Sequence, residues 1–324
     1  PDVYSDPPEL RETLQKKLGT FPLFNFWGPT ANVVSTQWIA RATQHVYDEH
    51  KPTLTLVYLP HLDYCLQKLG PSHPDIPKHL KEVDDVCGEL IAHVKKDGTR
   101  VIVLSEYGIT DVKDAVHINR VLRSAGLLRV REEEHGREQL DAGASQAFAV
   151  SDHQLAHVYV RDPARIAEVQ SLLANVPGIE RVVGEEGKRE LGLDHPRSGE
   201  LVAISAADRW FSYYHFLDDD RAPDFARCVE IHRKPGYDPV ELFVDPKLAL
   251  PKLVIAGKLA RKLLGFRTLM DVIPLDASLV RGSHGRLTDR PEDGPLFMTD
   301  TPELVPASQV DATDVKRLVL SHVF

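Results

Sequence analysis

Two apolar, β-rich runs each end at a group of polar side chains. They are Thr53–Leu59 and Val101–Ser105, and neither strictly alternates polar and apolar positions. Such runs are typical of strands buried on both faces, as in a parallel sheet. Ligand sites in open α/β sheets lie beyond the carboxyl ends of the strands. We therefore expect the loops that follow these two runs to contribute to one site.

Amphipathic segments around these strands predict helices. Apolar residues recur at helical spacing over residues 76–94, and Asp97-Gly98 follows as a stop signal. A helix is also predicted over 117–125. The remaining predicted helices of this core cover residues 9–18, 32–47, 254–264 and 312–320. Strands that alternate with helices predict βαβ units and therefore an α/β fold, with a mostly parallel central sheet between helices.

The pattern changes near Arg131, where a polar stretch predicts an exposed loop. Short strands are then predicted at 147–150, 156–160, 179–183 and 201–205, with one helix at 164–173. This order is typical of a small ferredoxin-like α+β subdomain. We therefore expect an insertion at 131–205 within a core formed by 1–130 and 206–324.

Composition excludes several classes of protein. The 324 residues carry a formal net charge of −9, which argues against a nucleic-acid partner because phosphate binding needs a basic surface. The sequence has no apolar run that approaches the length of about 20 residues needed to span a bilayer. The chain has only three cysteines, a small and odd number that does not suit a disulfide framework. We therefore expect a reducing, cytoplasmic location. The chain begins at Pro1 with a connector-like segment, and we expect it to start partway through a larger protein.

The first candidate site residues follow the Thr53–Leu59 run. Asp63 is suited to bind a divalent metal, to act as a base or to cap the next helix, and the sequence leaves these alternatives open. His61 and Gln67 flank it and could join a metal shell or contact substrate.

Further candidates follow the second run and lie in a late loop. Glu106 could bind a metal through oxygen, and Tyr107 is a hydrogen-bond donor rather than a ligand. His284 stands in Gly-Ser-His-Gly, where glycines let the backbone approach a site and leave the imidazole uncrowded. An incidental histidine in a flexible loop is the alternative.

Together these motifs resemble the alkaline phosphatase superfamily, and within it the nucleotide pyrophosphatase/phosphodiesterase and phosphonoacetate hydrolase group. That group carries Asp-x-x-x-His followed by Gly-Pro, where this chain has Asp63, Gln67 and Gly70-Pro71. It carries Ser-Asp-His-Gly-Met where this chain reads Ser105–Ile109, SEYGI. Its late Gly-x-His-Gly matches Gly282–Gly285.

The resemblance implies an alkaline phosphatase-like fold with two divalent metals, usually zinc. It also implies a Thr or Ser nucleophile on an N-terminal segment of the same protein that is absent from this sequence. Asp63, Glu106 and His284 match metal ligands. Gln67 and Tyr107 each stand where the group has a histidine, and a neutral phenol is a poor zinc ligand. One or both metal sites would then be weakened, shifted toward an oxygen-preferring metal, or lost.

Three functions stay open on this basis. The first is a metal-dependent phosphodiesterase or nucleotide pyrophosphatase that acts on a small phosphorylated substrate. The second is a non-hydrolytic or metal-impaired relative that binds a phosphorylated metabolite in a biosynthetic pathway, as the residues at Gln67 and Tyr107 suggest. A carbon–phosphorus hydrolase or a phosphomutase on the same scaffold is the third, because a fold does not determine a function.

Overall fold

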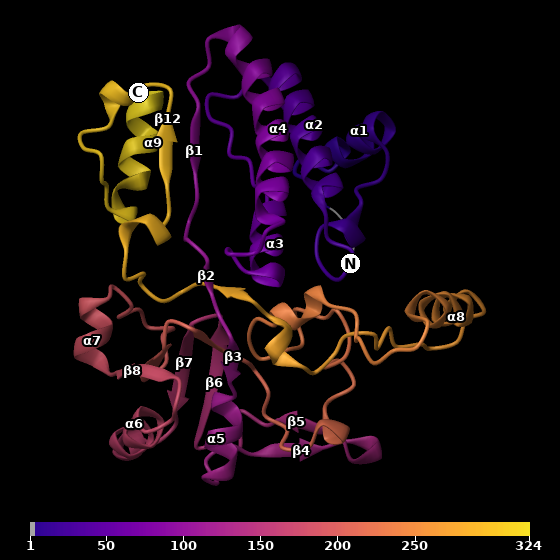
Figure 1. Ribbon diagram of the computed structural model, residues 1–324, viewed down its shortest axis with the longest axis vertical. Helices are drawn as coiled ribbons and strands as arrows, with labels where there is room; N and C mark the ends of the chain where they lie inside the picture. Colours follow the sequence, from indigo (N-terminus) through magenta and orange to yellow (C-terminus); the bar gives the residue numbers. More distant parts are fainter. Residues whose placement is uncertain (1–3) are drawn as a thin grey trace. The chain divides into compact units, whose positions relative to one another are not determined.

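The chain forms two compact units of mixed helix and strand. A computed structural model describes residues 4–324 (Figure 1). The first unit comprises Pro1–Cys65, His73–Gly108 and Arg290–Phe324, and the second comprises Leu66–Ser72 and Ile109–Asp289. The expectation of an α/β class is therefore confirmed at the level of a mixed helix and strand fold, whereas the arrangement of the strands differs from the prediction.

Helices dominate the first unit. They are α1 (Glu9–Leu18), α2 (Val33–His50), the first half of α3 (His61–Leu69), α4 (Ile76–Val94) and α9 (Val315–Val323). Short 3-10 turns lie at Leu23–Asn25, Lys95–Asp97, Pro291–Asp293, Pro302–Leu304 and Ala312–Asp314. The Asn32 side chain accepts a hydrogen bond from the backbone of Val34 and so caps α2. α2 and α4 pack side by side, and Ala40 and Val86 are buried there (Figure 1).

The first predicted strand is not formed. Residues 53–59 are extended but make no backbone hydrogen bond with any residue between 4 and 324. Leu54, Leu56 and Tyr58 are exposed, Leu56 at 83%. The second predicted strand is β1 (Ile102–Leu104), which pairs antiparallel with β12 (Phe297–Thr299). An apolar pattern indicates which side chains of a strand would be buried. A strand forms only where a neighbouring backbone also pairs with it.

The largest sheet lies in the second unit and is antiparallel. Its order is β6 (Ala147–Asp152), β7 (Leu155–Val160), β9 (Leu201–Ser205) and β8 (Ile179–Val183). α6 (Ile166–Ala174) packs on this sheet, and α7 (Glu185–Glu190) lies between β8 and β9 in sequence. The predicted strands and helix of this segment are thus present, whereas the insertion boundaries at 131 and 205 stay a prediction.

The other strands of the second unit form pairs. β3 (Asp114–Val116) and β10 (Arg209–Phe211) are the one parallel pair among the named strands of the described chain. The antiparallel pairs are β2 (Thr110–Asp111) with β11 (Gly282–Ser283) and β4 (Val130–Glu132) with β5 (Glu138–Leu140). The β4–β5 hairpin takes the place of the predicted exposed loop after Arg131. A mostly parallel central sheet is therefore not confirmed.

Two large cores and a smaller cluster around Val183, Val202 and Ile204 hold the second unit together. One large core lies between the four-stranded sheet, α6 and α5 (Ile118–Ser124), and the other surrounds Trp210, Tyr213 and Phe216. α8 (Pro251–Leu263) begins at a proline, which suits the first turn of a helix, and has no buried residue. Short 3-10 turns lie at Glu134–Gly136, Pro163–Arg165, Asp219–Arg221, Pro239–Leu242 and Ala277–Leu279.

Candidate functional site

Asp63 and Tyr107 meet in the first unit. Asp63 lies in the first turn of α3, where a carboxylate is favoured by the partial positive charge of the helix N-terminus. Tyr107 follows β1, and its Oη donates a hydrogen bond to Oδ1 of Asp63 over 3.1 Å. Two of the predicted site residues, 44 positions apart, are therefore in direct contact.

Glu106 belongs to the same neighbourhood. The Tyr58 side chain is 55% exposed, but its hydroxyl is partly desolvated, which raises its pKa, and the negative charges of Asp63 and Glu106 raise it further. Both carboxylates are therefore near enough to this hydroxyl for their charges to oppose its ionisation. Asp63 is half-buried and Glu106 is exposed. The cluster thus offers oxygen ligands from the first turn of α3 and from the loop after β1.

Tyr107 stays protonated in this setting. Burial raises the pKa of its phenol far above the ordinary value of 10.0, and the charge of Asp63 raises it further. A phenol that keeps its proton donates a hydrogen bond but does not supply a phenolate ligand. The interpretation of Tyr107 as a donor is supported by this geometry.

A close backbone crossing holds the loop after β1. A Cβ added at Gly108 would lie 1.8 Å from the carbonyl oxygen of Asp293. No side chain fits there, since real Cβ atoms essentially never come within 3.0 Å of another heavy atom. The glycine after Tyr107 is therefore required by the crossing.

His61 takes part in a separate cluster on α3 and α4. Its Nε2 lies 3.0 Å from Oε2 of Glu82, and Nδ1 of His79 lies 3.1 Å from the same oxygen. The thiol of Cys65 lies 4.0 Å from Nδ1 of His61. The structure thus brings His61 to Cys65 and His79, two residues absent from the predicted site. Their signal in the sequence is the pair of one-turn spacings, His61 to Cys65 and His79 to Glu82.

His284 lies in the second unit, in the loop after β11. Its imidazole packs on that of His153, with 3.8 Å between ring centroids, and its carbonyl accepts a hydrogen bond from the backbone of Gln154. Burial lowers the pKa of His284 to about 4, so the ring is neutral at neutral pH. Gly285 follows with φ of 108°, a backbone conformation that favours glycine. A neutral imidazole is the form that binds metals.

Gln67 is buried in the second unit. Its backbone carbonyl accepts a hydrogen bond from the backbone of Arg281. Of the predicted residues, Asp63, Glu106 and Tyr107 therefore cluster in the first unit, whereas Gln67 and His284 belong to the second. The convergence of Asp63, Glu106 and His284 on one cleft stays a prediction.

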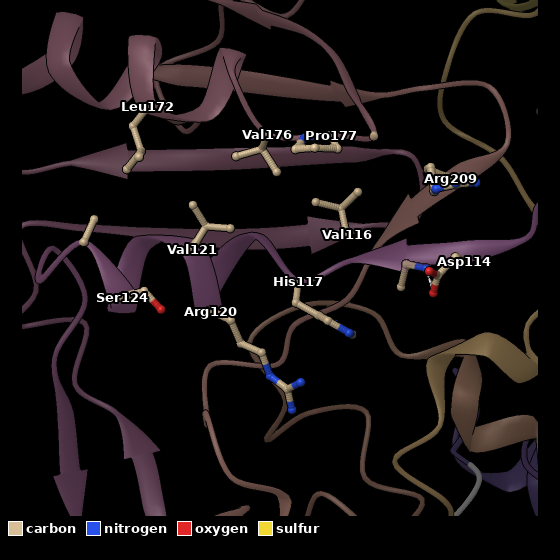
Figure 2. Close-up of a pocket in the computed structure, with 13 residues that line it drawn as sticks. Asp114, Val116, His117, Arg120, Val121, Ser124, Leu172, Val176, Pro177 and Arg209 are labelled. Atoms are coloured by element: carbon tan, nitrogen blue, oxygen red, sulfur yellow. Dashed lines mark hydrogen bonds between the residues drawn. The ribbon is translucent and has the colours of Figure 1, made fainter.

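A cavity of about 780 Å³ opens in the second unit beside β3, α5 and Gly178 (Figure 2). Its polar side chains include His117, Arg120 and Arg209, and none of the predicted site residues lines it. Arg120 is engaged with the carbonyl of Phe216 and with Asp219. Burial, and then the charge of Arg120, lowers the pKa of His117 to about 4. The cavity is therefore separate from the predicted chemistry.

The sequence matches the type I phosphodiesterase/nucleotide pyrophosphatase family over residues 1–238. The chain belongs to this family. The resemblance expected from the three motifs is thereby confirmed. An uncharacterized pyrophosphatase/phosphodiesterase of Schizosaccharomyces pombe is 37% identical over 71 residues, which are 21% of this chain and 15% of the yeast protein.

The solved structure of one other protein has a similar fold. Phosphonoacetate hydrolase from Sinorhizobium meliloti, in complex with phosphonoformate, aligns with a TM-score of 0.51 and 16% identity. The alignment covers 90% of this chain and 57% of the hydrolase, so the chain spans little more than half of that protein. Murine ectonucleotide pyrophosphatase/phosphodiesterase 5 aligns with a TM-score of 0.42 and 18% identity, over 55% of this chain and 44% of the murine protein.

None of the helices between residues 4 and 324 combines the length and the apolar character needed to cross a bilayer.

Proposed function

We propose that this chain acts in a divalent-metal-dependent phosphoric ester hydrolase of the nucleotide pyrophosphatase/phosphodiesterase type. The observation that carries the proposal is the family match over residues 1–238. The proposed metal ligands are Asp63, Glu106 and His284. By the family resemblance, the proposed nucleophile is a Thr or Ser on a segment of the same protein that these 324 residues do not include.

The local chemistry supports carboxylate and imidazole ligands and argues against a phenolate ligand. Asp63 and Glu106 share the surroundings of Tyr58 and offer carboxylate oxygens, and His284 is a neutral imidazole. Tyr107 keeps its proton and donates to Asp63, so it does not fit a ligand role. A bound divalent ion would polarise a phosphoryl oxygen and stabilise the charge that develops on it. Zinc is proposed from the family, although a carboxylate-rich set also suits oxygen-preferring ions.

The proposed substrate is a small phosphorylated compound. The Sinorhizobium meliloti hydrolase was solved with phosphonoformate and with phosphonoacetate, two small phosphonates. The net charge of −9 disfavours a nucleic acid as substrate. The proposal keeps the cytoplasmic location expected from the sparse cysteines.

The test measures metal content and hydrolysis of a nitrophenyl phosphodiester by the full protein that carries this chain. We expect turnover with bound divalent metal, and we expect Asp63→Asn and Glu106→Gln to abolish it. Asp84→Asn removes an exposed carboxylate from α4 and serves as the matched control, with activity retained. No bound metal and no turnover with zinc, manganese or magnesium would overturn the proposal.

A second function is favoured by one contact. Because Tyr107 donates to Asp63, this carboxylate is already engaged by a group that cannot bind a metal, which suits a non-hydrolytic protein that binds a phosphorylated metabolite. If this function is correct, replacing Gln67→His and Tyr107→His together will sharply raise zinc affinity and hydrolysis. Rapid turnover by the unaltered protein would contradict it.

A further inference from the structure

α3 and α4 bring three soft or borderline metal ligands together. One ligand atom from each of His61, Cys65 and His79 lies within 4.8 Å of the others. His61 and Cys65 are one helical turn apart on α3, so both side chains project from one face of that helix. His79 comes from the first turn of α4. All three residues belong to the first unit.

Glu82 orients the two imidazoles. Its Oε2 is 3.0 Å from Nε2 of His61 and 3.1 Å from Nδ1 of His79. The other nitrogen of each ring is then the one that would face a metal. Metal-binding histidines almost always donate their second ring nitrogen to a carboxylate, a carbonyl or water, which fixes the tautomer and the ring orientation. Glu82 occupies that position for both rings at once.

The distances between the ligand atoms are slightly longer than those expected around a bound zinc ion. With Zn–N of about 2.0–2.1 Å and Zn–S of about 2.3 Å, tetrahedral ligands lie about 3.3–3.7 Å apart. Sγ of Cys65 lies 4.0 Å from Nδ1 of His61 and 3.9 Å from its Nε2, so both distances are within a few tenths of an ångström of this range. The limit of 4.8 Å for the whole group requires a shift of about one ångström, which side-chain rotation supplies.

The thiol indicates which metal the cluster would bind. A hydrogen-bonded cluster needs only the two histidines and Glu82, whereas one thiolate with two imidazoles is a ligand set for zinc. We propose that His61, Cys65 and His79 bind one Zn²⁺ that joins α3 to α4, with Glu82 holding both imidazoles and water completing the tetrahedron. Binding requires the Cys65 thiolate, and its proton is released to solvent. The site does not include Asp63, Glu106 or His284 and does not depend on the proposed hydrolysis.

Cobalt substitution tests the site directly. Co²⁺ bound to a thiolate gives a sulfur-to-metal charge-transfer absorption in the near ultraviolet, which carboxylate and imidazole ligands do not give. We expect this band in the full protein and its loss in Cys65→Ser. Cys87→Ser removes a thiol from α4 outside the cluster and is the matched control, with the band retained. Asp63→Asn must also retain the band, which separates this test from that of the proposed hydrolase.

Zinc content and affinity give an independent readout. His79→Gln should lower bound zinc by one equivalent, whereas His93→Gln, on the same helix, should not. Glu82→Gln should weaken zinc binding at this site about 10–100-fold, the usual effect of losing an orienting carboxylate. Circular dichroism of each variant without metal establishes that it folds, and Cys65→Ala replaces Cys65→Ser if the latter does not. No charge-transfer band in the unaltered protein, or a band that survives Cys65→Ser, overturns the site.

Discussion

Oη of Tyr107 donates a hydrogen bond to Oδ1 of Asp63 across 3.1 Å, so the loop after β1 is joined to the first turn of α3. This contact places a proton donor on the carboxylate that the sequence identifies most strongly as a metal ligand. Metal and phenol therefore compete for the oxygens of Asp63. The balance between them bears directly on whether this family member hydrolyses phosphoric esters.

Tyr107→Phe tests this competition. Removing the hydroxyl leaves the ring in place and frees Oδ1 of Asp63 from its donor. A hydrogen bond to a charged group contributes about 1.5–3 kcal/mol, so divalent metal should bind about 10–150-fold more tightly. Isothermal titration with zinc and manganese measures the change. Tyr159→Phe, which removes a hydroxyl bonded to the Arg197 carbonyl, is the control, and equal effects of both variants would refute the competition.

Glu138→Gln should strongly destabilise the second unit. Glu138 is almost fully buried and accepts two hydrogen bonds from the guanidinium of Arg123. Removing one partner of a buried ion pair leaves an uncompensated charge and costs about 3–5 kcal/mol. Urea unfolding measures the loss.

The matched control for this pair is Glu168→Gln. Arg165 and Glu168 form the same two-pronged contact on the surface of the protein. Surface ion pairs contribute about 0–1 kcal/mol because water screens them. If Glu168→Gln lowered the free energy of unfolding as much as Glu138→Gln, burial would not explain the effect of Glu138→Gln.

Gly108→Ala should disturb the loop that carries Glu106 and Tyr107. The added methyl would meet the Asp293 carbonyl at 1.8 Å, so the backbone must move. Overpacking of this kind costs about 1–3 kcal/mol, and metal binding should weaken with it. Gly257→Ala in α8 meets no heavy atom within 4 Å and should stabilise the protein by about 0.5–1 kcal/mol. Urea unfolding of both variants checks the opposite signs.

Stability should fall as pH drops from 6.5 toward 4, in part because of His215. Burial lowers the pKa of this imidazole from 6.5 to about 4. In that window the unfolded chain binds a proton that the folded chain does not, so the free energy of unfolding decreases by about 1.4 kcal/mol per pH unit from this group. His215→Gln should reduce the slope by that amount in urea titrations at several pH values. A slope in His215→Gln equal to that of the unaltered protein would contradict the assignment.

Local pattern was a good guide to most of the helices and to the antiparallel segment, but the expectation of a loop after residues 53–59 was wrong, because α3 forms there. The stripe over 76–94 appears as α4, and the short strands at 179–183 and 201–205 appear as β8 and β9 with the predicted bounds. Their periodicity is set by which side chains must be buried, and that information is local. Residues 53–59 carry an equally clear apolar pattern, yet no described segment pairs with them.

The sequence by itself determined the family and showed that Gln67 and Tyr107 replace expected histidines, and it predicted Asp63 and Glu106 as metal ligands. Residue identity and spacing are sufficient for those conclusions. Only the tertiary structure decided that Tyr107 donates to Asp63 and that His61 meets Cys65, His79 and Glu82. These contacts depend on how α3 packs against α4 and against the end of β1. Spacing along the sequence predicts which residues are neighbours within one helix. Contacts between separate elements depend on how those elements pack, and no single segment specifies that packing.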